Sequence, residues 1–157
     1  MEIRPALKSD YEVFCKLMLE LDQLYVTGQP QFFKLPVDPV RSTELFLEEI
    51  APSFGGAFFA FEGATAIGFI SFYVSETYDF PTVIKRKLLI VRNLVVAKNY
   101  KRKGVGKMLI SIIKDWAENH KCHAVDLTVQ SFNLEALEFY KSEGFSVQAW
   151  LMTLALS

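Results

Sequence analysis

The sequence predicts an α/β domain built around a mixed β-sheet. Short apolar β-like runs alternate along the chain with segments whose apolar residues recur at helical spacing. A long apolar run at 87–97 also passes directly into a glycine turn and a strongly amphipathic helix. The expected order is β-α-α-β-β-β-α-β-α-β. The strands on either side of that helix, 87–97 and 123–129, are expected to be parallel because a crossover helix joins them.

The chain is expected to begin with a strand at 3–6 followed by a helix. Ser9 and Glu12 match a capping box, in which the two side chains satisfy free amides at the start of a helix. The helix then has one apolar face made of residues at helical spacing: Phe14, Leu17, Met18, Leu21, Leu24 and Tyr25.

A loop at 28–36 separates this helix from a second one. Asp38 offers an N-cap and Pro39 suits the first helical position, so the second helix is expected to run from there to about Ile50. Residues 57–61 and 66–74 are expected to form a β-hairpin rich in Phe and Ile.

The clearest helical periodicity follows the glycine turn. It consists of Val105, Met108, Leu109, Ile112, Ile113 and Trp116. Asn133 is expected to cap a last helix that ends at Glu143, with Gly144 as the left-handed residue beyond it. Residues 145–156 are again β-like, as one strand or as two.

Length and composition favour a single domain that spans 1–157 and has a substantial core. The chain has 157 residues, about half of them apolar, and 14 phenylalanines, which fit either a heavily packed core or an apolar cleft. A formal net charge of −1 argues against a protein that mainly coats nucleic acid.

Cysteine usage and hydropathy indicate a cytoplasmic protein without a membrane partner. Cys15 and Cys122 are the only cysteines, as expected of small apolar side chains in a reducing compartment. His120, Cys122 and His123 could in principle bind a metal, but a helix end followed by a strand start explains them better, so no metal site is predicted. The N-terminus lacks a signal pattern, and no run reaches the ~18 apolar residues that span a bilayer.

The segment with the most chemical content is the basic glycine turn from Tyr100 to Gly106. Glycines allow backbone N–H groups to turn toward a ligand, and the first turn of the following helix leaves amides free. Four cations surround this point, Lys101, Arg102, Lys103 and Lys107. The segment therefore suits a pyrophosphate.

Two common nucleotide motifs are excluded by particular residues. A Walker motif needs four residues between its glycines and a Lys-Ser/Thr pair, whereas only Val105 separates Gly104 from Gly106. A dinucleotide fingerprint needs a third glycine where Leu109 stands.

A second motif lies downstream and consists of Asn133, Ala136, Tyr140, Gly144 and Phe145. Together with Lys101 to Gly106, which follows the apolar strand, it resembles the GCN5-related N-acetyltransferase family. That family's first motif is Arg/Gln-x-x-Gly-x-Gly/Ala, so Lys101 is a departure, with Arg102 adjacent. The resemblance covers essentially the whole chain.

The resemblance implies a three-layer α/β fold whose mixed central sheet has about six to seven strands, with about four helices. It implies direct transfer of acetyl from acetyl-CoA to a primary amine, of a small molecule or a peptide, in a ternary complex. The implied cofactor-binding residues are Leu94, Val95, Val96, Lys101, Arg102, Lys103, Gly104, Val105, Gly106, Lys107, Asn133 and Tyr140. Tyr140 is the implied acid for the leaving thiolate, since the pKa of a phenol, ~10, lies just above that of a thiol.

The general base and the acceptor stay open. Arg92 and Asn93 stand where many relatives carry a carboxylate, so a relayed water, Glu76 or Asp79 are the alternatives. A backbone amide in the 94–96 segment is the expected oxyanion donor. The expected substrate lining, which could equally be core, is Tyr25, Gln29, Phe32, Phe33, Tyr78 and Phe80.

Two rival functions remain. The missing strand carboxylate would fit a catalytically silent acetyl-CoA sensor. The basic clusters at 85–87 and 98–107 would fit a nucleic-acid-binding module, although the cofactor's phosphates account for the second. The apolar segment 150–156 would allow a homodimer that shares its final strand.

Overall fold

The computed structural model describes residues 1–51, 53 and 55–156. In chain order its elements are β1 (Glu2–Pro5), a 3-10 turn η1 (Lys8–Asp10), α1 (Tyr11–Gly28), α2 (Thr43–Glu49), β2 (Gly55–Glu62), β3 (Thr65–Glu76), β4 (Lys87–Val96), a 3-10 turn η2 (Lys98–Tyr100), α3 (Val105–Asn119), β5 (Ala124–Asp126) and α4 (Leu134–Ser142). None of the helices in these ranges is long and apolar enough to cross a bilayer.

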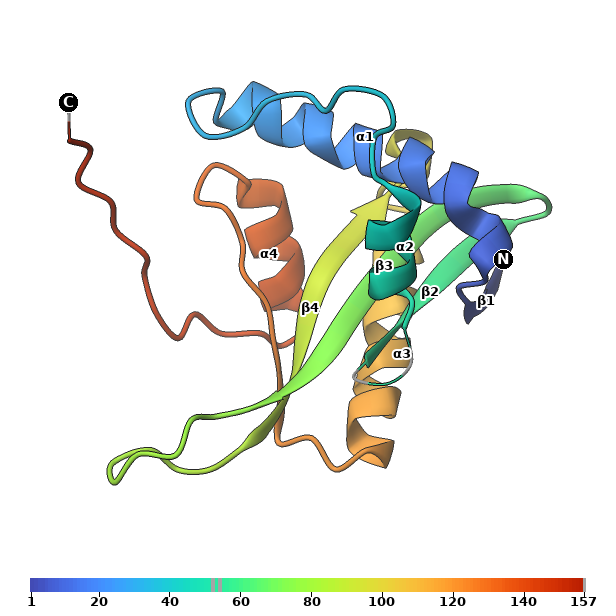
Figure 1. Cartoon of the computed structure of the whole chain (residues 1–157). Coiled ribbons are helices and arrows are strands. Elements are labelled where there is room, and N and C mark those ends of the chain that lie inside the picture. Colours follow the sequence, from blue (N-terminus) through green and yellow to red (C-terminus); the bar gives the residue numbers. More distant parts are fainter. Residues whose placement is uncertain (52, 54, 157) are drawn as a thin grey trace.

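The strands form one mixed sheet in the order β1-β2-β3-β4-β5 (Figure 1). The first four pair antiparallel, and β5 joins β4 in parallel through the α3 crossover. The α/β class and the parallel pair are therefore confirmed. The described sheet has five strands, somewhat fewer than the expected six to seven.

The fold has three layers, as expected. α1 and α2 cover one face of the sheet through Phe14, Phe46 and their neighbours, and α3 covers the other face through Leu109 and Ile113. α4 lies on the α3 side, where Phe139 packs against the α3 core. The face under α1 is aromatic: Phe14 lies 4.8 Å from Phe46 and 5.2 Å from Phe69, measured between ring centroids. Much of the phenylalanine content is therefore core.

The first helix starts near the predicted position, but its predicted cap and the predicted start of the second helix are wrong. α1 begins after Asp10, whose carboxylate accepts from the Leu7 amide at 2.7 Å and forms an ion pair with Arg4 at 2.8 Å, so no Ser9–Glu12 box caps it. α2 begins after Ser42, whose hydroxyl accepts from the Leu45 amide at 3.2 Å.

The later start of α2 has a tertiary cause. Arg41 makes a bidentate ion pair with Asp22 of α1, and the Arg41 carbonyl accepts from the hydroxyl of Tyr11. These contacts hold the chain against α1 where the sequence predicts a first helical turn. The helix can therefore begin only after Arg41, and Asp38 and Pro39 lie outside it.

The C-terminal part also differs from the prediction. β5 ends at Asp126 instead of 129, and 145–156 forms neither strand nor helix. Phe145 packs against the core, and the chain beyond it runs away from the domain (Figure 1, dark red). The segment has an apolar, β-like composition, yet it contains no Gly, Pro, Asn or Asp to turn it back into a hairpin. A hairpin formed within the segment itself is therefore not expected.

Both ends of α4 agree with the prediction from the sequence. The Asn133 side chain accepts from the Ala136 amide at 3.1 Å, which is the predicted N-cap. Gly144 adopts φ +94°, the left-handed conformation expected beyond the end of this helix.

Candidate functional site

The site lies where β4 separates from β5. Their ladder joins only Leu88–Ile90 to Ala124–Asp126, whereas β4 stays paired with β3 as far as Val96. From Val91 onward one edge of β4 is therefore without a neighbouring strand in the described sheet. Such an edge offers a row of backbone donors and acceptors to an extended ligand.

A β-bulge in β4 marks the point of separation. Asn93 faces Ser71 and Val91 faces Phe72, so Arg92 is an extra residue on β4. Arg92 is exposed, and its guanidinium lies 4.8 Å from the centre of the Tyr73 ring. Bulges bend a strand and increase its local twist, which turns β4 away from β5 here.

A cavity of about 60 Å³ occupies the separation. α1 contributes Tyr25, β4 contributes Asn93 and Leu94, and α4 with its cap contributes Tyr140 and Asn133. Residues 127–130, which follow β5 without pairing to β4, complete the lining. The structure thus brings together four of the expected site residues, Leu94, Asn133, Tyr140 and Tyr25.

Tyr140 is largely buried among aromatic rings. The ring centroids of Phe139 and Phe145 lie 5.2 and 5.6 Å away. Burial raises the pKa of the Tyr140 phenol well above its usual range, and the nearby Tyr25 adds to the shift. The phenol therefore keeps its proton at any pH near neutrality.

The end of α1 gathers three of the expected substrate residues. Tyr25 lies 5.0 Å from Phe33 between ring centroids, and burial, followed by the charge of Asp22, raises the pKa of its phenol. Gln29 caps α1, and its buried Oε1 has no hydrogen-bond partner among the described residues. Phe32, beside them, is exposed.

The other expected lining residues are elsewhere. Tyr78 and Phe80 lie on the long β3–β4 loop that projects from the domain (Figure 1), 6.0 Å from one another and exposed. The two candidate bases from the sequence lie on the same projection, where Glu76 is paired with Lys85 at 3.4 Å and Asp79 is exposed. None of the four lines the cavity.

The glycine turn has the shape of an anion cradle. Arg102 and Gly104 have φ of +60° and +84°, and Gly104 is the N-cap residue of α3. Left-handed residues in such a turn point successive amides to one side, where the free amides of the helix start add to them. The Val105 side chain is buried, so only its backbone can bind a ligand. A Cβ atom at Gly106 would lie 3.1 Å from the Phe139 ring.

The charged side chains of the turn are exposed and partly paired. Lys101 and Arg102 each lie 3.8 Å from Glu135 in the first turn of α4, and Lys103 lies over the Tyr100 ring at 4.9 Å. Lys107 projects from the first turn of α3. The turn can therefore bind an anionic group, with a net positive charge that Glu135 reduces.

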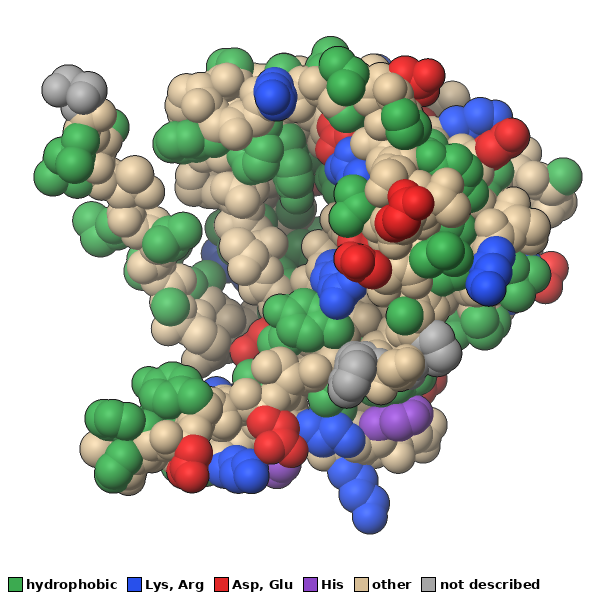
Figure 2. All heavy atoms as spheres, viewed as in Figure 1, with side chains coloured by type: hydrophobic (Ala, Val, Ile, Leu, Met, Phe, Trp, Pro, Cys, Tyr) green, Lys and Arg blue, Asp and Glu red, His purple; other side chains and the backbone are tan. Residues whose placement is uncertain are grey.

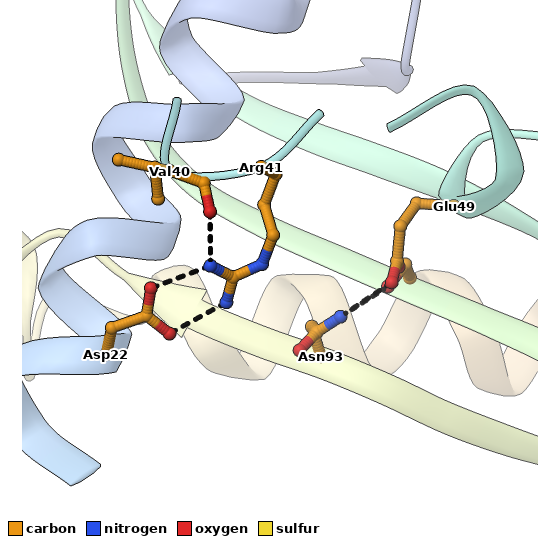
Figure 3. A network of polar contacts seen from close by, with 6 residues as sticks. Asp22, Val40, Arg41, Glu49 and Asn93 are labelled. Carbon is orange, nitrogen blue, oxygen red and sulfur yellow. Dashed lines mark hydrogen bonds and ion pairs between the residues drawn. The ribbon is translucent and has the colours of Figure 1, made fainter. Parts of the chain in front are cut away.

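A polar network beside the cavity was not foreseen from the sequence (Figure 3). Glu49 of α2 reaches Asn93 on β4 and Ser71 on β3, and Asp22 of α1 pairs with Arg41 at 2.7 Å. The sequence signal was that Ser71 and Asn93 are polar residues inside strands that are mostly apolar. Which carboxylate they meet is set by the tertiary fold.

The histidines and cysteines are accounted for separately. His120 stacks on Trp116 at 3.6 Å, and His123 Nδ1 accepts from the Lys87 amide at 2.9 Å. Cys15 and Cys122 are free thiols. Across 1–51, 53 and 55–156, no three His, Cys, Asp or Glu side chains are grouped as metal ligands.

The fold, the open edge of β4 and the basic turn agree with one protein family. The acetyltransferase (GNAT) family model matches residues 19–145, so the chain belongs to this family. The resemblance drawn from the two sequence motifs is thereby confirmed.

Curated relatives support the same class at low identity. An uncharacterised N-acetyltransferase of Bacillus subtilis, YhfO, is 26% identical over 150 residues, which is 92% of this chain and 89% of that protein. Streptothricin acetyltransferase A of B. subtilis is 38% identical over 61 residues, which is 38% of this chain and 35% of the relative. The second match thus spans only about a third of its relative.

Solved structures have the same fold. A mutant of the BH1408 protein from Bacillus halodurans superposes with a TM-score of 0.94, covers 100% of both chains and is 24% identical. AAC(6')-Iy, solved in complex with the bisubstrate analogue CoA-S-monomethyl-acetylneamine, superposes with a TM-score of 0.75 at 19% identity, covering 99% of this chain and 97% of that one.

Proposed function

We propose that this protein transfers the acetyl group of acetyl-CoA to a primary amine, by direct transfer in a ternary complex. One observation carries the proposal: the unpaired edge of β4 runs from the cavity beside Tyr140 to the anion cradle at Gly104. A ligand that is extended in its middle and anionic at one end fits that path, and acetyl-CoA is such a molecule.

The residues that would hold the cofactor form two groups, one for its amide-containing arm and one for its pyrophosphate. Backbone groups of Leu94, Val95 and Val96 would pair with its amide-containing arm as an added strand. Backbone amides of the turn and the side chains around them would hold the pyrophosphate. These groups belong to Lys101, Arg102, Lys103, Gly104, Val105, Gly106 and Lys107. Bound acetyl-CoA would supply a thioester as the acetyl donor.

Tyr140 is the proposed proton carrier for the leaving thiolate. Because burial raises the pKa of its phenol, the loss of its proton to a thiolate is unfavourable unless a proton returns at once. Tyr140 therefore passes a proton to sulfur while it takes one from the amine nitrogen. Asn133, which caps α4, fixes the start of the helix that carries Tyr140.

The acceptor is proposed to be a small cationic amine. This is supported by the relatives, a streptothricin acetyltransferase and an aminoglycoside acetyltransferase, and by the Glu49 carboxylate, which accepts a hydrogen bond from Asn93 of the cavity lining. A lysine-containing peptide is the alternative acceptor.

The test combines binding with turnover. Calorimetry with acetyl-CoA is expected to give one site per chain. Release of CoA, followed with a thiol reagent, is measured with streptothricin, neamine, spermidine and a lysine peptide, and saturable release with at least one of them is expected. Cofactor binding without transfer to any amine would favour the silent sensor. Tight binding of duplex DNA at physiological salt without cofactor binding would favour the nucleic-acid module.

We also propose that the chain forms a homodimer by exchanging its C-terminal segment. Trp150, Leu151, Met152, Leu154 and Leu156 are each at least 77% exposed, and the arm that they form stands apart from the body of the molecule (Figure 2). The segment 145–156 also contains no charged residue. An apolar, uncharged segment of this length is seldom left in water.

A groove in the same chain has the shape to receive such a segment. It has a volume of about 440 Å³ and lies between β5 and the 143–148 segment, and Lys114 and Arg86 also line it. A strand placed there would pair with the outer edge of β5 and extend the sheet. Since the segment cannot turn back on itself, the proposed occupant is the segment of a second copy, in a reciprocal twofold exchange.

Light scattering after size exclusion tests the exchange. The full chain is expected to be a dimer, and removal of residues 149–157 is expected to give a folded monomer. Leu151→Asp together with Leu154→Asp should act like the truncation, whereas Gln23→Asp, at an exposed position of α1 outside the groove, is the control for added charge. A monomeric full chain at 50 µM, about the upper range of weak dimers, would rule the exchange out.

A further inference from the structure

A carboxylate from α2 lies against the part of β4 that borders the cavity. Asn93 Nδ2 donates to Glu49 Oε1 at 3.1 Å, and the Ser71 hydroxyl donates to Glu49 Oε2 (Figure 3). Asn93 Nδ2 also lies 3.4 Å from Ser71 Oγ, which closes the triangle. Because Asn93 lines the cavity, Glu49 lies one hydrogen bond from the cavity wall.

Glu49 lacks a cationic partner. It is half-buried, and across 1–51, 53 and 55–156 no Lys, Arg or His nitrogen lies within the 4.0 Å of an ion pair with its carboxylate. Arg41 is the charged neighbour, but both of its terminal nitrogens are committed to Asp22 at 2.8 and 2.7 Å. A half-buried carboxylate that is held only by neutral donors is suited to a cation from outside the chain.

The surrounding face of the sheet makes this polar cluster costly to maintain. Phe59, Phe69 and Val95 are buried on the same face. Ser71 is fully buried beside them, and it meets a charge rather than another ring. Apolar residues in these positions would stabilise the fold at least as well. The cluster therefore indicates a function rather than a contribution to stability.

The β4 bulge gives the cluster its position. Arg92, as the extra residue, shifts the strand so that Asn93 lies opposite Ser71, at the start of the unpaired edge. Leu94, the first residue of the segment proposed to pair with the cofactor, follows directly. The carboxylate thus stands beside the proposed location of the thioester, on the face that α1 and α2 cover.

We propose that Glu49 binds the ammonium group of the acceptor amine and removes the proton that blocks its attack. This inference rests on the proposed acetyl transfer and assigns its general base. Glu49 takes one proton from R–NH3⁺ and later releases it to water. The C–N bond forms and the C–S bond breaks, and the second nitrogen proton reaches the sulfur through Tyr140, which ends protonated as it began. Asn93 and Ser71 are positioning residues that orient the carboxylate.

Charged and titratable groups face this site from each neighbouring element. α1 contributes Asp22, Cys15 and Tyr11, the α1–α2 connection contributes Arg41, and β4 contributes Arg92. The Asp22–Arg41 pair is neutral as a unit, whereas Arg92, which is exposed and lies over the Tyr73 ring, also lines the cavity and carries a positive charge there. Among these described groups Glu49 is the carboxylate without an ion-pair partner, and its link to the cavity runs through Asn93.

The decisive experiment follows Glu49→Gln across pH. The acceptor is spermidine, or whichever of the four acceptors tested above gives the highest kcat/KM. Its acetylation is measured from pH 6.5 to 9.5 at saturating acetyl-CoA. Loss of a general base predicts a fall in kcat/KM of about 100-fold at pH 7. The deficit should shrink about tenfold per pH unit, because the fraction of free amine rises by that factor below the amine pKa. Glu48→Gln, the exposed neighbour on α2, is the matched control.

Further measurements separate this role from a structural one. The affinity of Glu49→Gln for acetyl-CoA should equal that of the wild type. Ser71→Ala keeps the Glu49 carboxylate but removes the hydrogen bond to its Oε2, so kcat/KM should fall only about fivefold. Two results would overturn the assignment of Glu49 while leaving the proposed acetyl transfer intact. One is a deficit of Glu49→Gln that is the same at every pH, and the other is a kcat/KM of Glu49→Gln within threefold of that of Glu48→Gln. A wild type that binds acetyl-CoA but acetylates no amine overturns the proposed function, and this inference with it.

Discussion

Glu135 lies 3.8 Å from Arg102, so that an acidic side chain of α4 faces the glycine turn at its most basic point. The other carboxylate oxygen of Glu135 lies 3.8 Å from Lys101 Nζ. All three side chains are well exposed, so these pairs contribute little to stability. Their effect is on the electrostatic potential, which Glu135 makes less favourable for an anion.

Removal of this charge is expected to tighten the binding of CoA. Glu135→Gln frees Lys101 and Arg102 for a pyrophosphate, and the dissociation constant measured by calorimetry should fall about threefold in low salt, with the gain lost near 1 M salt. Glu138→Gln, on the same helix and paired with Lys141, is the control. Weaker binding by Glu135→Gln would mean that Glu135 instead holds the turn in shape.

Gly104 provides a prediction about backbone strain. Its φ of +84° is costly for a side chain, while open space surrounds it, so Gly104→Ala should lose about 1 kcal/mol of stability without a clash. Gly63, at φ +58° in the β2–β3 turn, is equally open. Gly63→Ala should lose similar stability, measured by urea unfolding, yet only Gly104→Ala should weaken CoA binding. Equal CoA affinity in both variants would contradict the cradle.

Tyr140→Phe tests the proton carrier. The ring stays in place between Phe139 and Phe145, but the phenol proton is lost. The expected result is at least a tenfold lower kcat, as for loss of a positioned acid, with an unchanged dissociation constant for acetyl-CoA. Tyr73→Phe, which keeps the ring under Arg92, serves as the control. An unchanged kcat would assign Tyr140 to the core alone.

The Arg4–Asp10 pair gives a pH dependence of stability. The hydrogen bonds from Arg4 hold the pKa of Asp10 below its usual range, with the Leu7 amide adding to the effect and burial opposing it. The stabilisation is therefore present above the unfolded pKa of ~3.9 and is lost as pH falls through the lower folded pKa.

Asp10→Asn should accordingly lower the free energy of unfolding by about 2 kcal/mol at pH 7. The difference from the wild type should shrink at an acidic pH below the unfolded pKa of ~3.9 and vanish below the lowered folded pKa, because Asp10 is neutral in both states there. Urea unfolding at the two pH values measures this, with the exposed Glu12→Gln as the reference. A difference that persists at low pH would indicate a packing effect.

Local signals in the sequence predicted the parts of the molecule that local physics determines. The Asn133 cap and the left-handed Gly144 were predictable because each depends on residues a few positions away. The apolar strand that leads into the glycine turn was predictable for the same reason. The start of α2 was not, since Arg41 reaches Asp22, 19 residues earlier in the chain.

The same limit applies to the candidate site. Glu49 meets Asn93 across 44 residues, and no spacing rule connects a helix glutamate to a strand asparagine so far along the chain. The missing strand carboxylate was visible in the sequence, but its replacement from α2 was not. The segment 145–156 has the composition of a strand, yet composition does not say whose sheet it enters.

β4 changes its character halfway along its length. Up to Ile90 it is an interior strand with neighbours on both sides, and beyond that residue it has the exposed edge that soluble proteins usually shield with charge, proline or a bulge. A bound pantetheine arm would act as that shield. Protein stripped of cofactor should then be the form that self-associates on storage. Added CoA should prevent this association, because it would cover the open edge of β4 as a neighbouring strand would.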